Sequence, residues 1–189
     1  GTVPHNVIIT ETTQSGGIKE ASLNGTWQNR PLSLVADAEL EKGGNILVQG
    51  VRLTQGENEL NAQGNLYSRQ AIESILQIGG KFPEQEKNNA SSLDFKINLV
   101  SLTDIYPDLS GQIFAKGNAS GSIEEPKIVV QANVQELVAE GLRLEDAQIN
   151  ASVDMANQLT SKAQISIVNL YTGTQNIPKL DLQISGDQD

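Results

Sequence analysis

The chain has 189 residues, a net charge of −10 and no cysteine. The length favours one domain with a sizeable apolar surface, and the acidic balance leaves no basic face that could neutralise phosphates, which excludes nucleic acid as a partner. The absence of cysteine excludes thiolate metal sites, cysteine nucleophiles and a disulfide framework.

An alternation of apolar and polar residues with a period of two runs through the chain. From Leu32 to Leu40 the apolar residues fall on one face and the polar residues on the other, with Val35 as the one exception. The same pattern returns in 60–66, 93–99, 113–123, 128–134, 147–155, 163–167 and 180–184. Turn signals such as Gly56 and Gly141 separate these stretches, as in antiparallel meanders. The sequence therefore predicts an all-β fold.

Two short stretches depart from this alternation. In 70–78 the apolar residues have helical spacing behind a possible cap at Ser68, which predicts a helix, with a strand through 75–78 as the alternative. Ser101 opens a capping-box pattern that predicts one or two helical turns, ended by Pro107. The polar stretch 81–92 predicts an exposed loop.

A faint internal repeat suggests that the single β segment contains two approximate copies, 18–92 and 93–189. Gly25-Thr26-Trp27, followed by Leu32, matches Gly121-Ser122-Ile123, followed by Ile128, at an offset of 96 residues. A strand meander of this kind cannot cover its own apolar face. In repeat arrays, neighbouring copies stack and bury such faces together.

The residue inventory argues against an enzyme. His5 is the only histidine, so neither a histidine-based triad nor a multi-histidine metal site can be built. Ser120 lies in a Gly-x-x-Ser-Gly stretch, but no base is available to activate it. Pairs of acids, such as Glu145 and Asp146, fall at predicted turns, where solvated charge explains them. We expect no catalytic residue, no metal and no cofactor.

The apolar face is the informative feature. About a dozen half-apolar strands with almost no helix to cover them must either pack face to face as a sandwich or curl around a trough. A sandwich leaves no space for a ligand, whereas a trough of strands about 4.8 Å apart forms an apolar groove on the order of 50 Å long.

Several stretches resemble the periplasmic repeats of the TamB family. They are Leu-Asp-Phe-Lys-Ile-Asn-Leu at 93–99, Leu-Thr-Asp-Ile-Tyr-Pro-Asp-Leu-Ser-Gly at 102–111 and Gly-Asn-Ala-Ser-Gly-Ser-Ile-Glu-Glu-Pro at 117–126. The shared cadence is a short helix, Leu-Ser-Gly, Gly-x-x-x-Gly and a proline before a strand. The stretch 25–40, with its Trp and Pro, resembles an earlier copy.

The resemblance implies a curled antiparallel sheet forming a taco-like trough with an apolar interior. It also implies a parent protein that is anchored in the inner membrane of Gram-negative bacteria and crosses the periplasm to a TamA-like outer-membrane partner. The implied roles are phospholipid transport between membranes and assembly of outer-membrane proteins and autotransporters. No apolar run approaches the roughly 18 residues of a spanning helix, so we expect any anchor to lie outside this segment.

The leading hypothesis is an apolar groove that holds phospholipid acyl chains or amphipathic β-strands of client proteins. The residues expected to line it are Leu32, Leu34, Leu60, Ile97, Ile113, Ile128, Val130, Ile149, Val153, Ile165, Ile167, Leu182 and Ile184. The alternative is a structural β-repeat spacer of a surface adhesin or autotransporter passenger, with a closed core and no ligand.

Overall fold

The computed structural model describes residues 5–14, 17–27, 29–40, 45–67, 91–121, 125–155 and 160–186. The helix predicted at 70–78 and the stretch 81–90 of the predicted loop lie outside these residues. The described part forms eleven strands and a single turn of 3₁₀ helix. Their bounds are β1 His5–Gln14, β2 Gly17–Trp27, β3 Arg30–Leu40, β4 Asn45–Gln55, β5 Asn58–Tyr67, β6 Ser91–Leu99, η2 Leu102–Asp104, β7 Ser110–Gly121, β8 Pro126–Ala139, β9 Leu142–Asp154, β10 Lys162–Tyr171 and β11 Asn176–Ser185.

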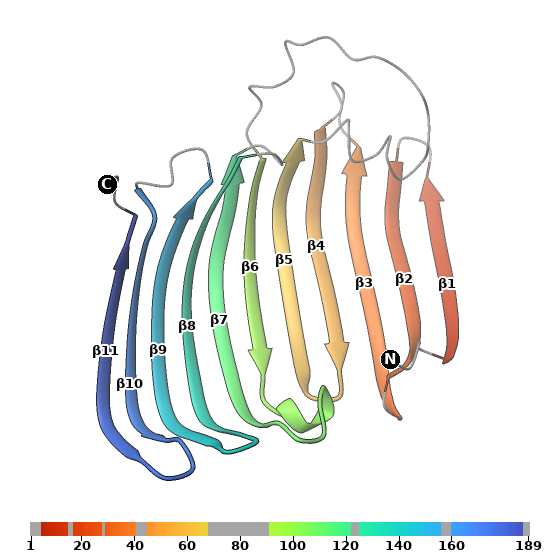
Figure 1. Ribbon diagram of the computed structural model, residues 1–189. Helices are drawn as coiled ribbons and strands as arrows, with labels where there is room; N and C mark the ends of the chain where they lie inside the picture. Colours follow the sequence, from red (N-terminus) through yellow and green to blue (C-terminus); the bar gives the residue numbers. More distant parts are fainter. Residues whose placement is uncertain are drawn as a thin grey trace.

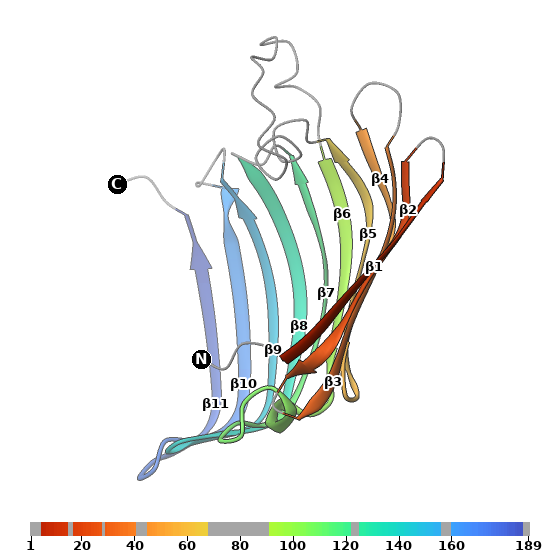
Figure 2. The ribbon, with the colours of Figure 1, turned by 90° about the vertical axis from the view of Figure 1, so that its right-hand side faces the viewer.

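All eleven strands belong to one antiparallel sheet whose spatial order is the chain order (Figure 1). Each inner strand pairs with the strands before and after it. The edge strands β1 and β11 each pair with one neighbour only, so the sheet is not closed. The strands bend along their length (Figure 2), which gives the single layer a curled, trough-like shape. The predicted all-β fold and the meander are confirmed.

Each of the eight alternating stretches of the sequence overlaps a strand, whereas β1, β2 and β4 lie outside these stretches. The sequence pattern did not reveal β4 because this strand contains a bulge, where its register with β5 shifts between Val48 and Val51. An extra residue in one strand moves the alternation by one position and hides the period of two. The turns at Gly56 and Gly141 are confirmed, with φ values of 59° and 71°.

The helical turn predicted after Ser101 is present as η2, but the capping box is wrong. The Ser101 side chain makes no cap hydrogen bond to the backbone, and its Oγ lies 3.0 Å from Thr103 Oγ1. The fourth residue of the pattern, Asp104, instead forms an ion pair with Arg30, at 2.8 Å. A tertiary partner has therefore replaced the local capping contact. The predicted loop also ends earlier than expected, because β6 begins at Ser91.

A set of polar contacts, which we call the clasp, joins three segments of the chain at one end of the sheet. Asn58 Nδ2 donates to the Ser101 carbonyl at 2.8 Å, and the Ser101 N–H donates to Asn58 Oδ1 at 3.0 Å. Gln55 Nε2 donates to the Asp104 carbonyl at 2.9 Å, and Arg30 pairs with the Asp104 carboxylate. The clasp thus links β3, the β4–β5 turn and the β6–β7 connection.

The alternation breaks at one common level in four neighbouring strands, β8 to β11. At this level the register pairs Leu137, Leu144, Leu170 and Ile177, three positions along the strands from Val134, Ala147, Ile167 and Leu180. Glu136 and Asn169, which lie between the two rows, have φ values of 49° and 52°. A left-handed residue shifts the alternation of the side chains, and Leu137, Leu144 and Leu170 pack with the buried residues Val134 and Ala147.

The left-handed conformation of Glu136 yields a stability prediction. We expect Glu136→Val to lower the free energy of unfolding by about 1–2 kcal/mol, because a β-branched side chain is poorly tolerated at positive φ. Glu136→Gly should change it by less than about 0.5 kcal/mol, since glycine adopts this conformation readily. Urea denaturation of both variants, with Gln135→Val as a control at the neighbouring exposed position, measures the difference. Equal stabilities of the two Glu136 variants would show that the positive φ of Glu136 does not disfavour a β-branched side chain.

Candidate apolar trough

One cross-strand row of apolar residues crosses the sheet from β2 to β11 without a polar interruption. The paired positions, in spatial order, are Leu23, Leu34, Leu53, Leu60, Ile97, Ala115, Ala132, Ile149, Ile165 and Leu182. Side chains opposite one another on antiparallel strands lie on the same face, with Cβ atoms about 5 Å apart. The row is therefore one continuous aliphatic band.

A second row runs parallel to the first, two residues along each strand. Its members are Ala21, Ala36, Val51, Ala62, Phe95, Gly117, Val130, Ala151, Ala163 and Ile184. Further apolar rows flank both, for example Leu93, Ala119, Ile128 and Val153. This face is thus apolar over most of its extent, with Gln55 and Asn58 of the clasp as polar members at one end.

The register places all thirteen sequence-predicted lining residues on this one face. The sequence analysis missed members of the strands that it did not predict, such as Leu23 in β2 and Val51 and Leu53 in β4. Val51 and Leu53 do alternate, but the bulge after Val48 puts them out of phase with the first half of β4. Trp27 lies two residues beyond Gly25 on β2, so it belongs to the same face, where it is half-buried.

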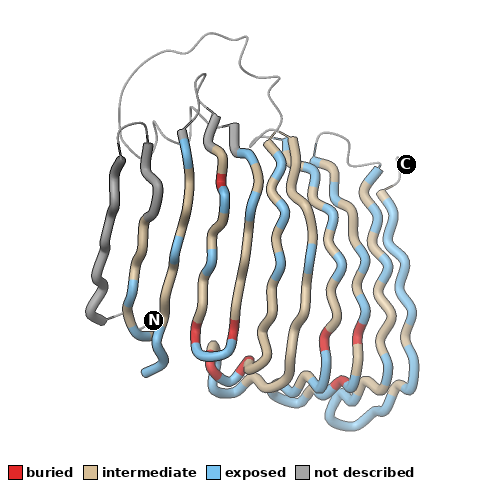
Figure 3. Tube along the Cα trace, turned by 180° about the vertical axis from the view of Figure 1, so that it is seen from behind, coloured by how far each residue is buried: buried red, intermediate tan, exposed pale blue. Residues whose placement is uncertain are grey.

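The side chains of the apolar face are partly buried by one another, but no second layer of the described residues covers them. Nine of the ten side chains in the first row are half-buried, and the neighbouring polar residues are mostly exposed, so the two burial classes alternate along the strands (Figure 3). Exposure rises toward β11, where Leu182 is 43% exposed and Ile184 57%. A closed core, as expected of a structural spacer, would bury these side chains, so the open sheet does not favour that alternative.

Phe95 packs its ring against the sheet at the centre of this face. A Cβ atom on Gly117, the neighbour of Phe95 across β6 and β7, would lie 2.5 Å from Phe95 Cζ and would overlap the carbonyl oxygen of Val129. The missing side chain of Gly117 therefore leaves the space that the ring occupies. On the apolar face of β7, Ala115, Gly117 and Ala119 are all small, so little side-chain volume stands out from the sheet along this strand.

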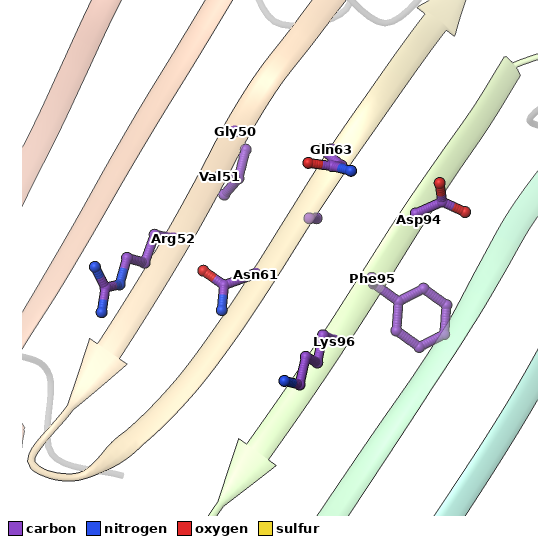
Figure 4. Close-up of a pocket in the computed structure, with 9 residues that line it drawn as sticks. Gly50, Val51, Arg52, Asn61, Gln63, Asp94, Phe95 and Lys96 are labelled. Carbon is purple, nitrogen blue, oxygen red and sulfur yellow. The ribbon is translucent and has the colours of Figure 1, made fainter.

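The opposite face is polar and carries the shallow hollows found in the described residues. One row on it reads Arg52, Asn61, Lys96, Lys116, Gln131, Asn150, Gln164 and Gln183. A hollow of about 400 Å³ lies among Arg52, Asn61, Gln63, Asp94 and Lys96, whose side chains Figure 4 shows on three adjacent strands. The sequence analysis assigned no role to this face.

Some of the charges on the polar face form ion pairs with one another. Arg52 Nε lies 2.5 Å from Glu59 Oε1, and Lys179 Nζ lies 2.9 Å from Asp181 Oδ2. A hydrogen bond from Ser166 and the nearby Lys179 ammonium lower the pKa of the exposed Asp181 carboxyl below its ordinary value. In the part of the chain that the structure describes, no three His, Asp or Glu side chains are placed to hold a metal ion.

An open, single-layer antiparallel sheet with one continuous apolar face makes this chain a trough-shaped β protein. The chain belongs to the TamB family: the family model described as "TamB, N-terminal domain" matches residues 1–189. The family resemblance of the sequence is confirmed.

A curated relative and the known structures complete the comparison. The chain is 27% identical over 169 residues to the "Translocation and assembly module subunit TamB" of Haemophilus influenzae, a match that covers 89% of this chain and 11% of that protein. The chain therefore spans about a tenth of the length of this relative. No solved structure matches it. None of the helices in the described residues is long and apolar enough to span a membrane.

Proposed function

We propose that this chain is a periplasmic trough segment whose apolar face holds the acyl chains of phospholipids passing between membranes. The observation that carries the proposal is the first apolar row, which crosses ten strands without a polar residue. With strands about 4.8 Å apart, the row extends on the order of 45 Å. An acyl chain that covers half-exposed aliphatic side chains gains about 25 cal/mol for each Å² removed from water.

The backbone of the sheet favours acyl chains over a client β-strand as the occupant of this face. The inner strands of the sheet are hydrogen-bonded to neighbours on both sides, so the face itself offers aliphatic side chains and no free backbone partners. A peptide strand laid across it would leave its own N–H and C=O groups unpaired, which is costly away from water. An acyl chain has no such groups.

The wider setting of the proposal follows the family. We place the parent protein in the inner membrane, with this segment in the periplasm and a TamA-like protein as its outer-membrane partner. Assembly of outer-membrane proteins and autotransporters is the other role in this setting, and it requires an amphipathic client strand on the same apolar face. The word "assembly" in the name of the Haemophilus influenzae relative supports it.

Val130→Arg tests the proposed lipid site. Val130 lies in the second apolar row next to Ala151, whose small side chain leaves room for a longer residue. A guanidinium on the apolar face disfavours acyl chains by about 2 kcal/mol, or roughly a thirtyfold loss of affinity. We expect native mass spectrometry of the 189-residue chain purified from bacteria to show bound phospholipid, and this variant to have lost it.

Val129→Arg is the matched control, because Val129 is the adjacent residue on the polar face and is 43% exposed. It adds the same charge to the same strand and should retain the lipid. Circular dichroism establishes that both variants keep their strands. Equal lipid loading of folded Val130→Arg and Val129→Arg would refute the lipid site, and co-purified peptides in place of lipid would favour the client-strand role.

A further inference from the structure

A hollow of about 590 Å³ lies on the polar face, over β6 to β9. Its lining comprises six amide side chains, two lysines, one aspartate and one phenylalanine, together with two alanines. Sites for apolar small molecules are lined mainly by apolar groups with a few polar ones. This lining instead brings together nine polar or charged side chains with only three apolar ones, so it suits a ligand that has many polar groups as well as an apolar surface.

Two lysines at one end of the hollow face each other. Lys96 on β6 and Lys116 on β7 are direct cross-strand partners, and both are exposed. Like charges opposite one another destabilise a sheet. Neither ammonium has an ion pair with any residue that the structure describes, and the nearby Asp94 accepts a hydrogen bond from Asn118 Nδ2 at 2.8 Å. A bound anion between the lysines would offset their repulsion, in a chain whose net charge is −10.

An aromatic ring lies beside the lysines on the same polar face. Phe114 is paired with Asn98 on one side and Asn133 on the other, and it is half-buried. A flat ring flanked by amides suits the C–H face of a sugar ring, which packs on the aromatic surface. Amide side chains both donate and accept hydrogen bonds, so they match hydroxyl groups, which do the same.

We propose that this hollow binds an acidic glycan, with a sugar ring on Phe114 and a carboxylate between Lys96 and Lys116. The amides of β8 and β9, among them Gln131, bind the hydroxyl groups. Asp146, which accepts a hydrogen bond from Asn133 Nδ2 at 2.8 Å, lies on β9, away from the lysines, and repels a carboxylate there. The arrangement gives the bound glycan a direction. An acidic peptide would engage the lysines alone, without using the ring or the amides.

Calorimetric titration with an oligomer of galacturonic acid tests the site. We expect it to bind the 189-residue chain, and the double variant Lys96→Gln/Lys116→Gln to bind it at least about tenfold more weakly. Phe114→Leu keeps an apolar side chain but loses the flat ring, and we expect about a fivefold loss. The control is Lys162→Gln, which removes an exposed lysine elsewhere on the polar face and should leave the affinity unchanged.

Three outcomes would overturn the glycan site. The first is no binding of the acidic oligomer at millimolar concentration. The second is equal binding of oligoglutamate, which would mean that an acidic peptide is recognised by charge alone. The third is full affinity in folded Phe114→Leu, as checked by circular dichroism. Galactose oligomers of the same length serve as the neutral comparison, and we expect them to bind more weakly than the acidic oligomer because they lack the carboxylate.

Discussion

Gly64→Ala is expected to lower the free energy of unfolding by about 3 kcal/mol. Gly64 has a φ of 149°, where an L side chain is strained, and an added Cβ would overlap the carbonyl oxygen of Ser92 and lie 2.9 Å from Leu93 Cα. Both are backbone atoms of β6, so neither can swing aside as a flexible side chain could. The expected loss is a large part of the 5–15 kcal/mol that stabilises an ordinary domain. Urea denaturation followed by circular dichroism measures it.

Gly50→Ala is the control for this experiment. Gly50 lies on β4, next to β5, and an added Cβ meets no atom within 4 Å. The substitution should leave the free energy of unfolding within about 0.5 kcal/mol of the parent chain, because Gly50 does not have a positive φ and the added methyl group has free space. A loss of less than about 1 kcal/mol in Gly64→Ala would instead show that β5 and β6 can separate near Ser92 without disturbing the sheet.

The period-two pattern was sufficient to predict the fold class, because the two faces of this sheet differ so strongly in polarity. Where the alternation is regular, as in Leu93 to Leu99, the predicted strand agrees with the structure to within two residues. The prediction failed where the backbone departs from a simple strand. The bulge in β4 and the left-handed residue Glu136 each shift the phase, and a local pattern contains no sign of which strand the shift must match.

The candidate site could be predicted in part for the same reason. Period two assigns residues to a face, but register decides which of them meet across strands. The contact between Gly117 and the Phe95 ring, for example, depends on a pairing between residues 22 positions apart. The polar hollow was not predicted because opposing lysines become visible only when β6 and β7 are aligned. The division into copies 18–92 and 93–189 stays a prediction.

Arg30→Met is expected to lower the free energy of unfolding by about 2 kcal/mol. Its partner Asp104 is only 5% exposed, and a carboxylate left buried without its cation is costly, about 3–5 kcal/mol for a fully buried pair. The Arg30 side chain is 54% exposed, so solvent screens part of this interaction and the expected loss is smaller. Arg52→Met, which breaks the more exposed pair with Glu59, should cost less than about 1 kcal/mol.

The double variant Arg30→Met/Asp104→Asn separates the ion pair from the rest of the clasp. It removes the stranded carboxylate and keeps the Asp104 backbone carbonyl that accepts from Gln55, so it should recover more than half of the stability that Arg30→Met loses. Hydrogen exchange should locate the remaining loss in the β4–β5 turn and the β6–β7 connection, which the clasp joins. If Arg30→Met and Arg52→Met cost the same, the burial of Asp104 contributes nothing. The stabilising effect of the clasp would then come from the Asn58 and Gln55 hydrogen bonds alone.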